Sequence, residues 1–242
     1  MKITDATWER RNLGVNTLEI ELDENDNINE LDEVLKSHID KEYVVVKSSV
    51  NNLDYIWGLP QRGFTYIESQ LSLEVTISDY NAPSYLKVME RSASLKILSE
   101  KEEVMLAMDR LAENVFDKDR ISLDQNFSPK LAGGRYKNWV RDLIDKGQDF
   151  LELYIKDIPI GFFIAQPSHD DVGIAGLAGL YGEYKGKGFG LVLIKKGMDY
   201  IFTMGHKKIV TSVSSNNKDI VKIHLLLGFM IKDIHYVYVK HQ

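Results

Sequence analysis

Extended and helical hydrophobic patterns alternate along this chain, and together they predict an α/β fold. Extended segments are indicated at 18–22, 43–47, 65–75, 149–156, 159–165, 172–181, 208–214 and 231–240. Apolar residues recur at helical spacing over 29–38, 100–116, 135–146 and 191–204, and a further helix is expected after Asn217. The stretch 84–99 fits either element. The order of the elements implies a mixed sheet with helices packed on both faces.

The chain also carries an internal repeat with an offset of 165 residues. Each copy predicts a strand, a helix that begins after Asn, a Gly-Phe turn and another strand. The aligned residues are Val45 with Val210, Ser49 with Ser214, Asn51-Asn52 with Asn216-Asn217, Asp54 with Asp219, and Gly63-Phe64 with Gly228-Phe229. We therefore expect a degenerate half-copy over 1–82, before a complete catalytic domain over 83–242.

Composition and charge restrict the class of protein. The 242 residues are 44% hydrophobic with a formal net charge of -6, which is typical of a globular protein and argues against a nucleic-acid partner. The absence of cysteine excludes disulfides, thiolate metal sites and cysteine nucleophiles, and suits a reducing cytoplasm. We expect no metal, because the six histidines show no ligand spacing, and no membrane partner, because no long apolar run occurs.

A glycine-rich run from Tyr184 to Gly190 precedes the helix expected at 191–204. The run reads Tyr-Lys-Gly-Lys-Gly-Phe-Gly. Glycines at a helix N-terminus let a phosphate approach unpaired backbone N–H groups, and Lys185 and Lys187 add positive charge. Lys195 and Lys196 extend the basic cluster. Leu191 stands where a nucleotide-hydrolysing phosphate loop needs Ser or Thr, and a dinucleotide fold would place its glycines earlier. An ordinary strand-to-helix connection remains the simpler interpretation of the run alone.

The glycine run, Asn217 and Gly228-Phe229 together resemble the GCN5-related N-acetyltransferase superfamily over residues 149–240. Lys185 stands where that superfamily usually has Arg or Gln. The resemblance implies a mostly antiparallel mixed sheet and acetyl-CoA as co-substrate. The residues that it implies for binding coenzyme A are Leu180, Lys185, Gly186, Lys187, Gly188, Phe189, Gly190 and Asn217.

A longer resemblance, to bacterial dTDP-fucosamine acetyltransferases, covers nearly the whole chain. It is carried by Trp8-Glu9, the segment 13–16, Gly63-Phe64 with Glu68, Arg120, and Arg135-Tyr136 with Trp139. It implies a nucleotide-linked amino sugar as acceptor, bound by Arg120 and Tyr136. Core packing is an equally simple explanation of the aromatic residues.

The chemistry implied by these resemblances is direct attack of an amine on the thioester. A bulge would leave backbone N–H groups near Leu180 to hold the oxyanion, and Glu68 would remove the proton of the amine. His224 occupies the position of the superfamily's usual tyrosine acid, so it is the candidate donor to the thiolate. Tyr181, Tyr184 or water are alternatives, and His224 packed on an apolar helix face is another.

Two further alternatives remain open at the level of the sequence. The acceptor of an acetyltransferase could be a polyamine, an antibiotic or a peptide amine, which an acidic cleft would favour, whereas Arg120 and Arg135 facing the cleft would favour an anionic nucleotide. Alternatively, the chain could be a non-catalytic module that binds acyl-CoA. An apolar strand near the C-terminus makes a homodimer plausible.

Overall fold

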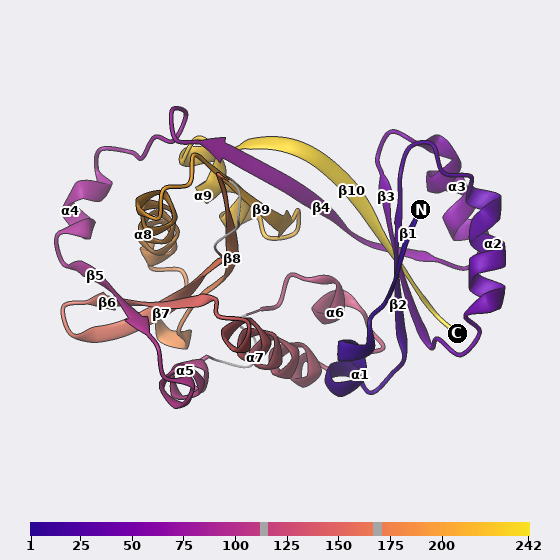
Figure 1. Ribbon diagram of the computed structural model, residues 1–242, viewed down its shortest axis with the longest axis horizontal. Helices are drawn as coiled ribbons and strands as arrows, with labels where there is room; N and C mark the ends of the chain where they lie inside the picture. The colour runs from indigo at the N-terminus through magenta and orange to yellow at the C-terminus, as the bar shows by residue number, and fades with distance from the viewer. Residues whose placement is uncertain (112–115, 167–170) are drawn as a thin grey trace.

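The computed structural model describes residues 1–111, 116–166 and 171–242, and Figure 1 shows their arrangement. The strands are β1 (Lys2–Asp5), β2 (Thr17–Leu22), β3 (Tyr43–Ser49), β4 (Thr65–Thr76), β5 (Ala93–Leu98), β6 (Asp149–Ile155), β7 (Ile158–Gln166), β8 (Val172–Leu180), β9 (Lys208–Ser214) and β10 (Met230–His241). The helices are α1 (Thr7–Leu13), α2 (Ile28–Ser37), α3 (Leu53–Gln61), α4 (Leu86–Glu90), α5 (Lys101–Met108), α6 (Arg120–Leu123), α7 (Pro129–Asp145), the 3-10 helix η1 (Gly182–Tyr184), α8 (Phe189–Thr203) and α9 (Lys218–Leu226).

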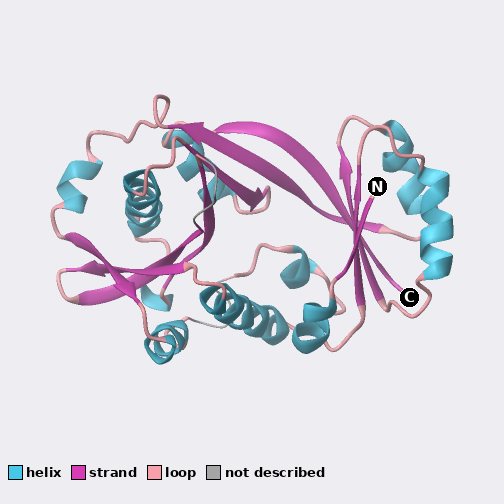
Figure 2. Cartoon of the chain, viewed as in Figure 1, coloured by secondary structure: helices cyan, strands magenta, loops and turns pink. Residues whose placement is uncertain are grey.

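All ten strands form one sheet in the order β1-β2-β3-β10-β4-β9-β8-β7-β6-β5. The neighbours β2 with β3 and β8 with β9 are parallel, and the other neighbours are antiparallel. Figure 2 shows helices on both faces of this sheet. The α/β fold predicted from the sequence is therefore confirmed.

Alternating residues of β10 show which helices share a face of the sheet. Ile234 packs into the apolar cluster of α8 and α9, whereas Tyr236 and Tyr238 pack into the cluster of α2 and α3. Alternate residues of a strand point to the same side, so these four helices cover one face. Val237 and Val239 point to the opposite face, where they pack with residues of α1, α6 and α7. We call this second face the α7 face.

The last strands of the two repeats are exchanged. β10 lies between β3 and β4, and β4 lies between β10 and β9, so each strand is inserted beside the other repeat. The offset of 165 residues superimposes the bounds of β3 on β9, of α3 on α9 and of β4 on β10 without a shift. The repeat expected from the sequence thus corresponds to three consecutive elements in each copy.

The strand register has the same two-fold symmetry. His235 pairs with Gln70 at the centre of the β4–β10 ladder, and these two positions are equivalent in the repeat. One irregularity in the ladder falls between Ile231 and Asp233 and the other between Val237 and Tyr238, at equivalent distances from the centre. The exchange joins both repeats in one hydrogen-bonded ladder. One sheet contains strands from both sides of residue 82, so the boundary proposed there does not separate two sheets. It stays a prediction about how the two halves arose.

Two expectations differ from the structure. The helix expected at 100–116 ends at Met108, where Arg110 and Leu111 form i→i+3 bonds to Ala107 and Met108, and residues 112–115 of that expectation lie outside the described part. α7 begins at Pro129, before the expected start at Arg135, because Pro suits the first turn of a helix. The ambiguous stretch 84–99 contains both α4 and β5.

The exchange predicts that a fragment of residues 83–242 does not fold alone. In the fragment, β10 loses both β3 and β4, and β9 loses β4. We expect a broad, non-cooperative thermal transition by circular dichroism, and a sharp one when residues 1–82 are co-expressed. A fragment that unfolds as cooperatively as the whole chain would contradict this account.

Candidate functional site

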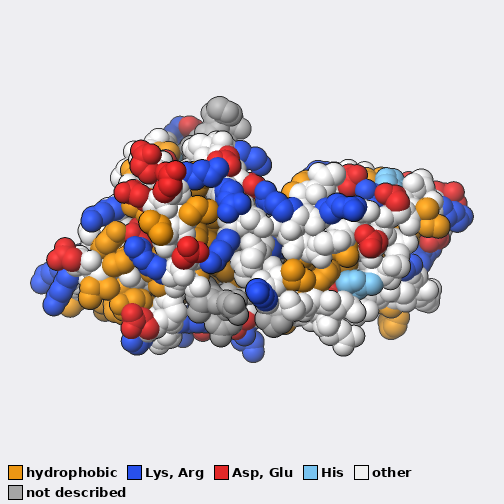
Figure 3. Space-filling model, turned by 90° about the horizontal axis from the view of Figure 1, so that it is seen from below, with side chains coloured by type: hydrophobic (Ala, Val, Ile, Leu, Met, Phe, Trp, Pro, Cys, Tyr) orange, Lys and Arg blue, Asp and Glu red, His pale blue; other side chains and the backbone are white. Residues whose placement is uncertain are grey.

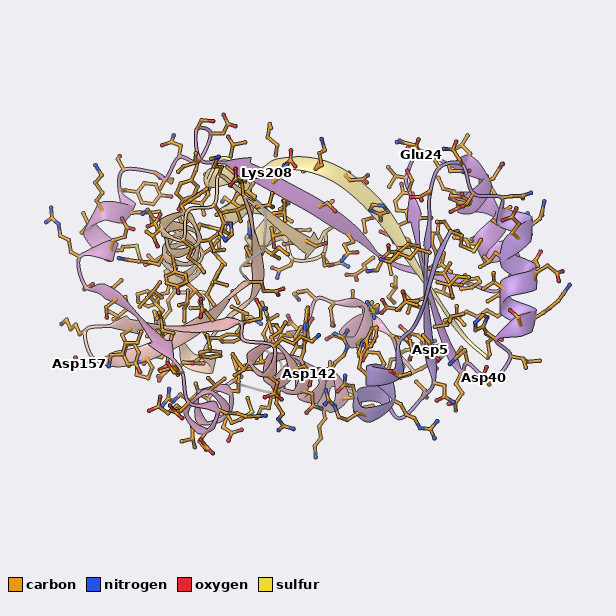
Figure 4. The ribbon with its side chains drawn as sticks, viewed as in Figure 1. Asp5, Glu24, Asp40, Asp142, Asp157 and Lys208 are labelled. Carbon is orange, nitrogen blue, oxygen red and sulfur yellow. The ribbon has the colours of Figure 1, made fainter. Side chains whose placement is uncertain are left out.

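Strands β8 and β9 are paired at their beginnings and then part. Their parallel ladder covers the pairs Val172–Lys208, Gly173–Ile209 and Ile174–Val210. β8 continues beside β7 as far as Leu180. Lys208, labelled in Figure 4, marks the paired end. After these three pairs, β8 and β9 form no further ladder pairs with each other.

The backbone of Leu180 is directed into this opening. The N–H of Tyr181 donates to the carbonyl of Ile160 on β7, at 2.9 Å. In an antiparallel ladder, successive residues alternate between bonding the partner strand and pointing away from it. The N–H of Leu180 therefore points away from β7, toward the side where β9 has parted. This geometry suits the oxyanion role expected for Leu180.

Two glycines allow β8 to take this path. The register between β7 and β8 shifts between the pairs Phe163–Ala178 and Ala165–Ala175, so a bulge lies upstream of Leu180 rather than beside it. A Cβ on Gly176 would lie 2.7 Å from a nitrogen of Gln166. A Cβ on Gly161 would lie 2.6 Å from the carbonyl oxygen of Gly179. Sequence analysis missed Gly161, although a glycine inside a strand is a signal for close backbone approach.

The glycine loop that follows β8 is open to solvent. Gly186 and Gly188 have φ of 79° and 82°, which L side chains rarely adopt, and nothing lies within 4 Å of a Cβ built on either. Gly188 is the N-cap of α8 and offers no side chain to its first N–H groups. The head of this 15-residue helix thus presents donors that a phosphate can accept.

The basic residues near the loop have different surroundings. The exposed Lys185 lies 3.5 Å from Asp117, and Lys187 lies over the ring of Tyr184. Lys195 is not at the loop, contrary to expectation, because it forms ion pairs with Glu90 and Asp199 on the flank of α8. Phe189, the first residue of α8, packs edge-on against Tyr184.

α9 begins beside the head of α8. Asn217 is its N-cap, and its side-chain oxygen accepts from the N–H of Ile220 at 3.4 Å. A Cβ on Gly190 would lie 3.4 Å from Ile223 of α9. Asn217 therefore acts as a helix cap in this structure, and a contact with coenzyme A stays a prediction.

His224 has the environment of a packed side chain. It is 3% exposed, its ring stands edge-on to Phe229, and its Nδ1 lies 2.8 Å from the carbonyl of Ile220. Burial lowers the pKa of His224, so the ring is neutral near pH 7. A neutral ring that donates its one proton to Ile220 has none for a thiolate. The structure therefore favours the packing alternative over an acid role for His224.

Glu68 is a buried carboxyl on the strand that neighbours β9. It lies on β4, two residues from Gln70, the partner of Ser214 at the end of β9. Glu68 thus lies on β4 just past the last residue pair of the β4–β9 ladder, while Leu180 ends β8 on the other side of β9. Glu68 is 7% exposed, and its Oε2 has no hydrogen-bond partner. Burial raises the pKa of Glu68, against a hydrogen bond from Ser214 and the charge of Arg120.

The predicted substrate residues Arg120 and Tyr136 lie near Glu68 on the α7 face. Arg120 is paired with Glu19 and lies 3.6 Å from Glu9. The hydroxyl of Tyr136 donates to Asp119 at 2.7 Å, and Arg135 binds Glu9 at 2.6 Å. Glu68, Arg120 and Tyr136 thus lie near one another, and Arg120 and Arg135 are both engaged with carboxylates.

A band of polar residues crosses the exchanged strands on the α7 face. The central row, given by the register, is Ser49, His235, Gln70 and Ser214. Lys47 stands on the same side of β3 as Ser49, and burial lowers the pKa of Lys47. Polar residues are unusual on a strand face that is directed toward a packed interior. This band was not recognised in the sequence, because it depends on pairing β10 with β3 and β4.

Comparison with known proteins supports the fold. A GCN5-related N-acetyltransferase from Kribbella flavida shares 12% identity at a TM-score of 0.59, covering 93% of this chain and 81% of that one. A tandem GNAT protein of the clavulanic acid biosynthesis pathway shares 10% identity at a TM-score of 0.56, covering 86% of this chain and 66% of that one.

A curated relative is more similar in sequence but covers less of the chain. The mycothiol acetyltransferase of Corynebacterium efficiens is 27% identical over 111 residues, which are 46% of this chain and 36% of the relative. The match thus spans about a third of the relative's length. No model of a protein family matches the chain.

The described ranges contain neither a membrane-spanning helix nor a metal-ligand cluster. No helix there is long and apolar enough to cross a membrane. No cluster of three or more His, Asp or Glu residues suited to a metal ion occurs in those ranges either. The chain has the fold of the GCN5-related N-acetyltransferases.

Proposed function

We propose that this chain is an N-acetyltransferase that uses acetyl-CoA and a small primary amine. The observation that carries the proposal is the gap between β8 and β9, which ends at an exposed glycine loop heading α8. Backbone donors at 186–190 would bind the diphosphate of coenzyme A, with Lys185 and Lys187 adding charge. The pantetheine arm would then lie in the gap.

The N–H of Leu180 would polarise the acetyl carbonyl. The amine nitrogen attacks the carbonyl carbon, the oxyanion forms at the Leu180 N–H, and the C–S bond then breaks. Coenzyme A leaves as a thiolate and takes up one proton. Tyr184, which lies within the loop, or water are the donors consistent with the packed state of His224.

Glu68 would take the proton that the amine loses. A carboxyl whose pKa is raised by burial is a stronger base than an ordinary one, and its pKa is closer to that of an amine. The unpartnered Oε2 of Glu68 is the atom we assign to this role. In this proposal Glu68 would act from the β4 side of β9 and Leu180 from the β8 side.

The acceptor would lie on the polar band of the α7 face. The narrower form of the proposal, a nucleotide-linked amino sugar, needs cations for two phosphates. Arg120 and Arg135 are engaged with Glu9 and Glu19, while Lys47 forms no ion pair with the described residues. Figure 3 shows basic and acidic side chains interspersed on the surface seen from below. These observations favour a polar amine without a diphosphate. Because the curated relative is a mycothiol acetyltransferase, an amine related to mycothiol is a second candidate of this kind.

Release of thiol from acetyl-CoA tests the activity directly. The chain has no cysteine, so a thiol reagent detects coenzyme A without background from the protein. We expect release that depends on a primary amine, measured across amino sugars, nucleotide-linked amino sugars and polyamines. Tight binding of coenzyme A without release for any amine would leave a non-catalytic binding module. The predicted homodimer and cytoplasmic location are separate expectations.

Replacing Gly188 with Ala should weaken binding of coenzyme A. A residue other than Gly at positive φ costs about 1 kcal/mol and tends to shift the loop. Gly14→Ala is the matched control, because Gly14 has φ of 80° and equally open surroundings far from the loop. We expect calorimetry to show roughly tenfold weaker binding for Gly188→Ala. Equal affinities for both variants would remove the loop from the site.

Glu68→Gln should separate catalysis from stability. Loss of a general base lowers kcat/KM by about 100-fold or more. The folded pKa of Glu68 is raised, so ionised Glu68 destabilises the folded chain above its unfolded pKa, and the neutral amide should keep or raise Tm at pH 7.5. Parallel losses of rate and Tm would instead indicate a structural role.

His224→Phe should leave kcat within about twofold, since His224 donates no proton in this account. The folded pKa of His224 is lowered, so the unfolded chain binds more protons below pH 6.5 and stability falls as pH drops through that range. Denaturant unfolding at pH 7.5 and 5.5 should show a smaller loss for His224→Phe than for the wild type. A large drop in kcat that His224→Tyr restores would instead establish an acid role.

A further inference from the structure

A buried carboxylate lies beneath the end of β8. Glu152 of β6 is 1% exposed and points to the α7 face, among the apolar residues that surround Phe150 and Phe162. An isolated charge in such a place costs several kcal/mol, so its hydrogen bonds are essential. Three groups provide them: the hydroxyls of Tyr154 and Tyr181, and the guanidinium of Arg110 at 2.5 Å.

Tyr181 connects this carboxylate to the candidate site. It is the residue after Leu180 and before η1, and it is 3% exposed. Its N–H bonds Ile160, its carbonyl accepts from Tyr184 at 2.9 Å, and its hydroxyl donates to Glu152 at 2.7 Å. Tyr181 is thus held at both backbone groups and at the tip of its side chain.

The loop after Tyr181 contacts the rest of the chain through Tyr184, which packs against Phe189, and through Lys185, which lies 3.5 Å from Asp117. Residues 182–188 are exposed except for the half-buried Tyr184, and the glycines at 186 and 188 contact no other part of the chain through a Cβ position. Glycine-rich, exposed backbone has many accessible conformations. The position of the loop therefore depends on where β8 ends, which Tyr181 fixes.

We infer that Tyr181 is a positioning residue, whose hydroxyl, held by Glu152 across two strands, sets the direction of the Leu180 amide and the place of the glycine loop. The hydroxyl itself is buried beneath the sheet and is engaged by Glu152, so Tyr181 does not act as the acid that the sequence left open. The kinetic part of this inference rests on the proposed function.

Tyr154 supplies a matched control. Its hydroxyl donates to the same carboxylate, but Tyr154 belongs to β6 and lies two residues from Glu152. Tyr154→Phe and Tyr181→Phe each remove one donor from Glu152 and preserve the ring. If the network only satisfies a buried charge, the two variants should behave alike. If Tyr181 positions the loop, only Tyr181→Phe should change it.

Amide hydrogen exchange of the whole chain tests this without a ligand. For Tyr181→Phe we expect exchange at residues 178–188 about tenfold faster than in the wild type, and for Tyr154→Phe within about twofold. With acetyl-CoA, Tyr181→Phe should raise KM about tenfold with a smaller change in kcat. Equal exchange in the two variants, or no change in either, would overturn the inference.

A second variant covers the case in which Tyr181→Phe does not fold. Glu152→Gln keeps an oxygen that accepts from Tyr181 but removes the charge, so exchange at 178–188 should rise above that of Tyr154→Phe. Unchanged exchange in Glu152→Gln would overturn the inference. If the wild type releases no thiol, the proposed function fails, whereas the exchange measurement still decides the role of Tyr181.

Discussion

The separation of β8 from β9 is the constraint on which the rest of this site depends. Two parallel strands that stay paired leave no unpaired edge between them, whereas these two part after three residue pairs. The edges then carry N–H and C=O groups that need other partners, because unpaired polar groups in an interior are costly. In the proposed function, the pantetheine arm of coenzyme A would supply such partners. The equivalent pair β2 and β3 stays paired over all of β2, so the N-terminal repeat offers no second gap.

The exchange of β4 and β10 brings together the residues that we propose for the acceptor side. Each strand leaves its own repeat and enters the other, and the polar residues of both meet on the α7 face. Glu68 reaches the opening from the N-terminal repeat, while Leu180 and the glycine loop belong to the C-terminal one. The proposed site would therefore draw residues from both repeats.

Much of the fold follows from sequence patterns that are local. Alternation and helical spacing located β6 to β9 and α8, and the 165-residue offset located α3 through its similarity to α9. Gly186 and Gly188 were identifiable because only glycine suits their positive φ. The end of α5 and the start of β5 were not, since they depend on tertiary contacts: Arg110 pairs with Glu152 just after α5, and β5 forms a ladder with β6.

The parts of the site that the sequence did not reveal are all non-local. The role of Arg120 depends on Glu19, about a hundred residues away, and that of Tyr181 on Glu152, two strands away.

The most direct test of the account is an NMR titration with coenzyme A that follows backbone amides. We predict large shifts at Leu180 and at 186–190, with none in β2 and β3. Absence of binding at millimolar coenzyme A, or shifts confined to other parts of the chain, would contradict it.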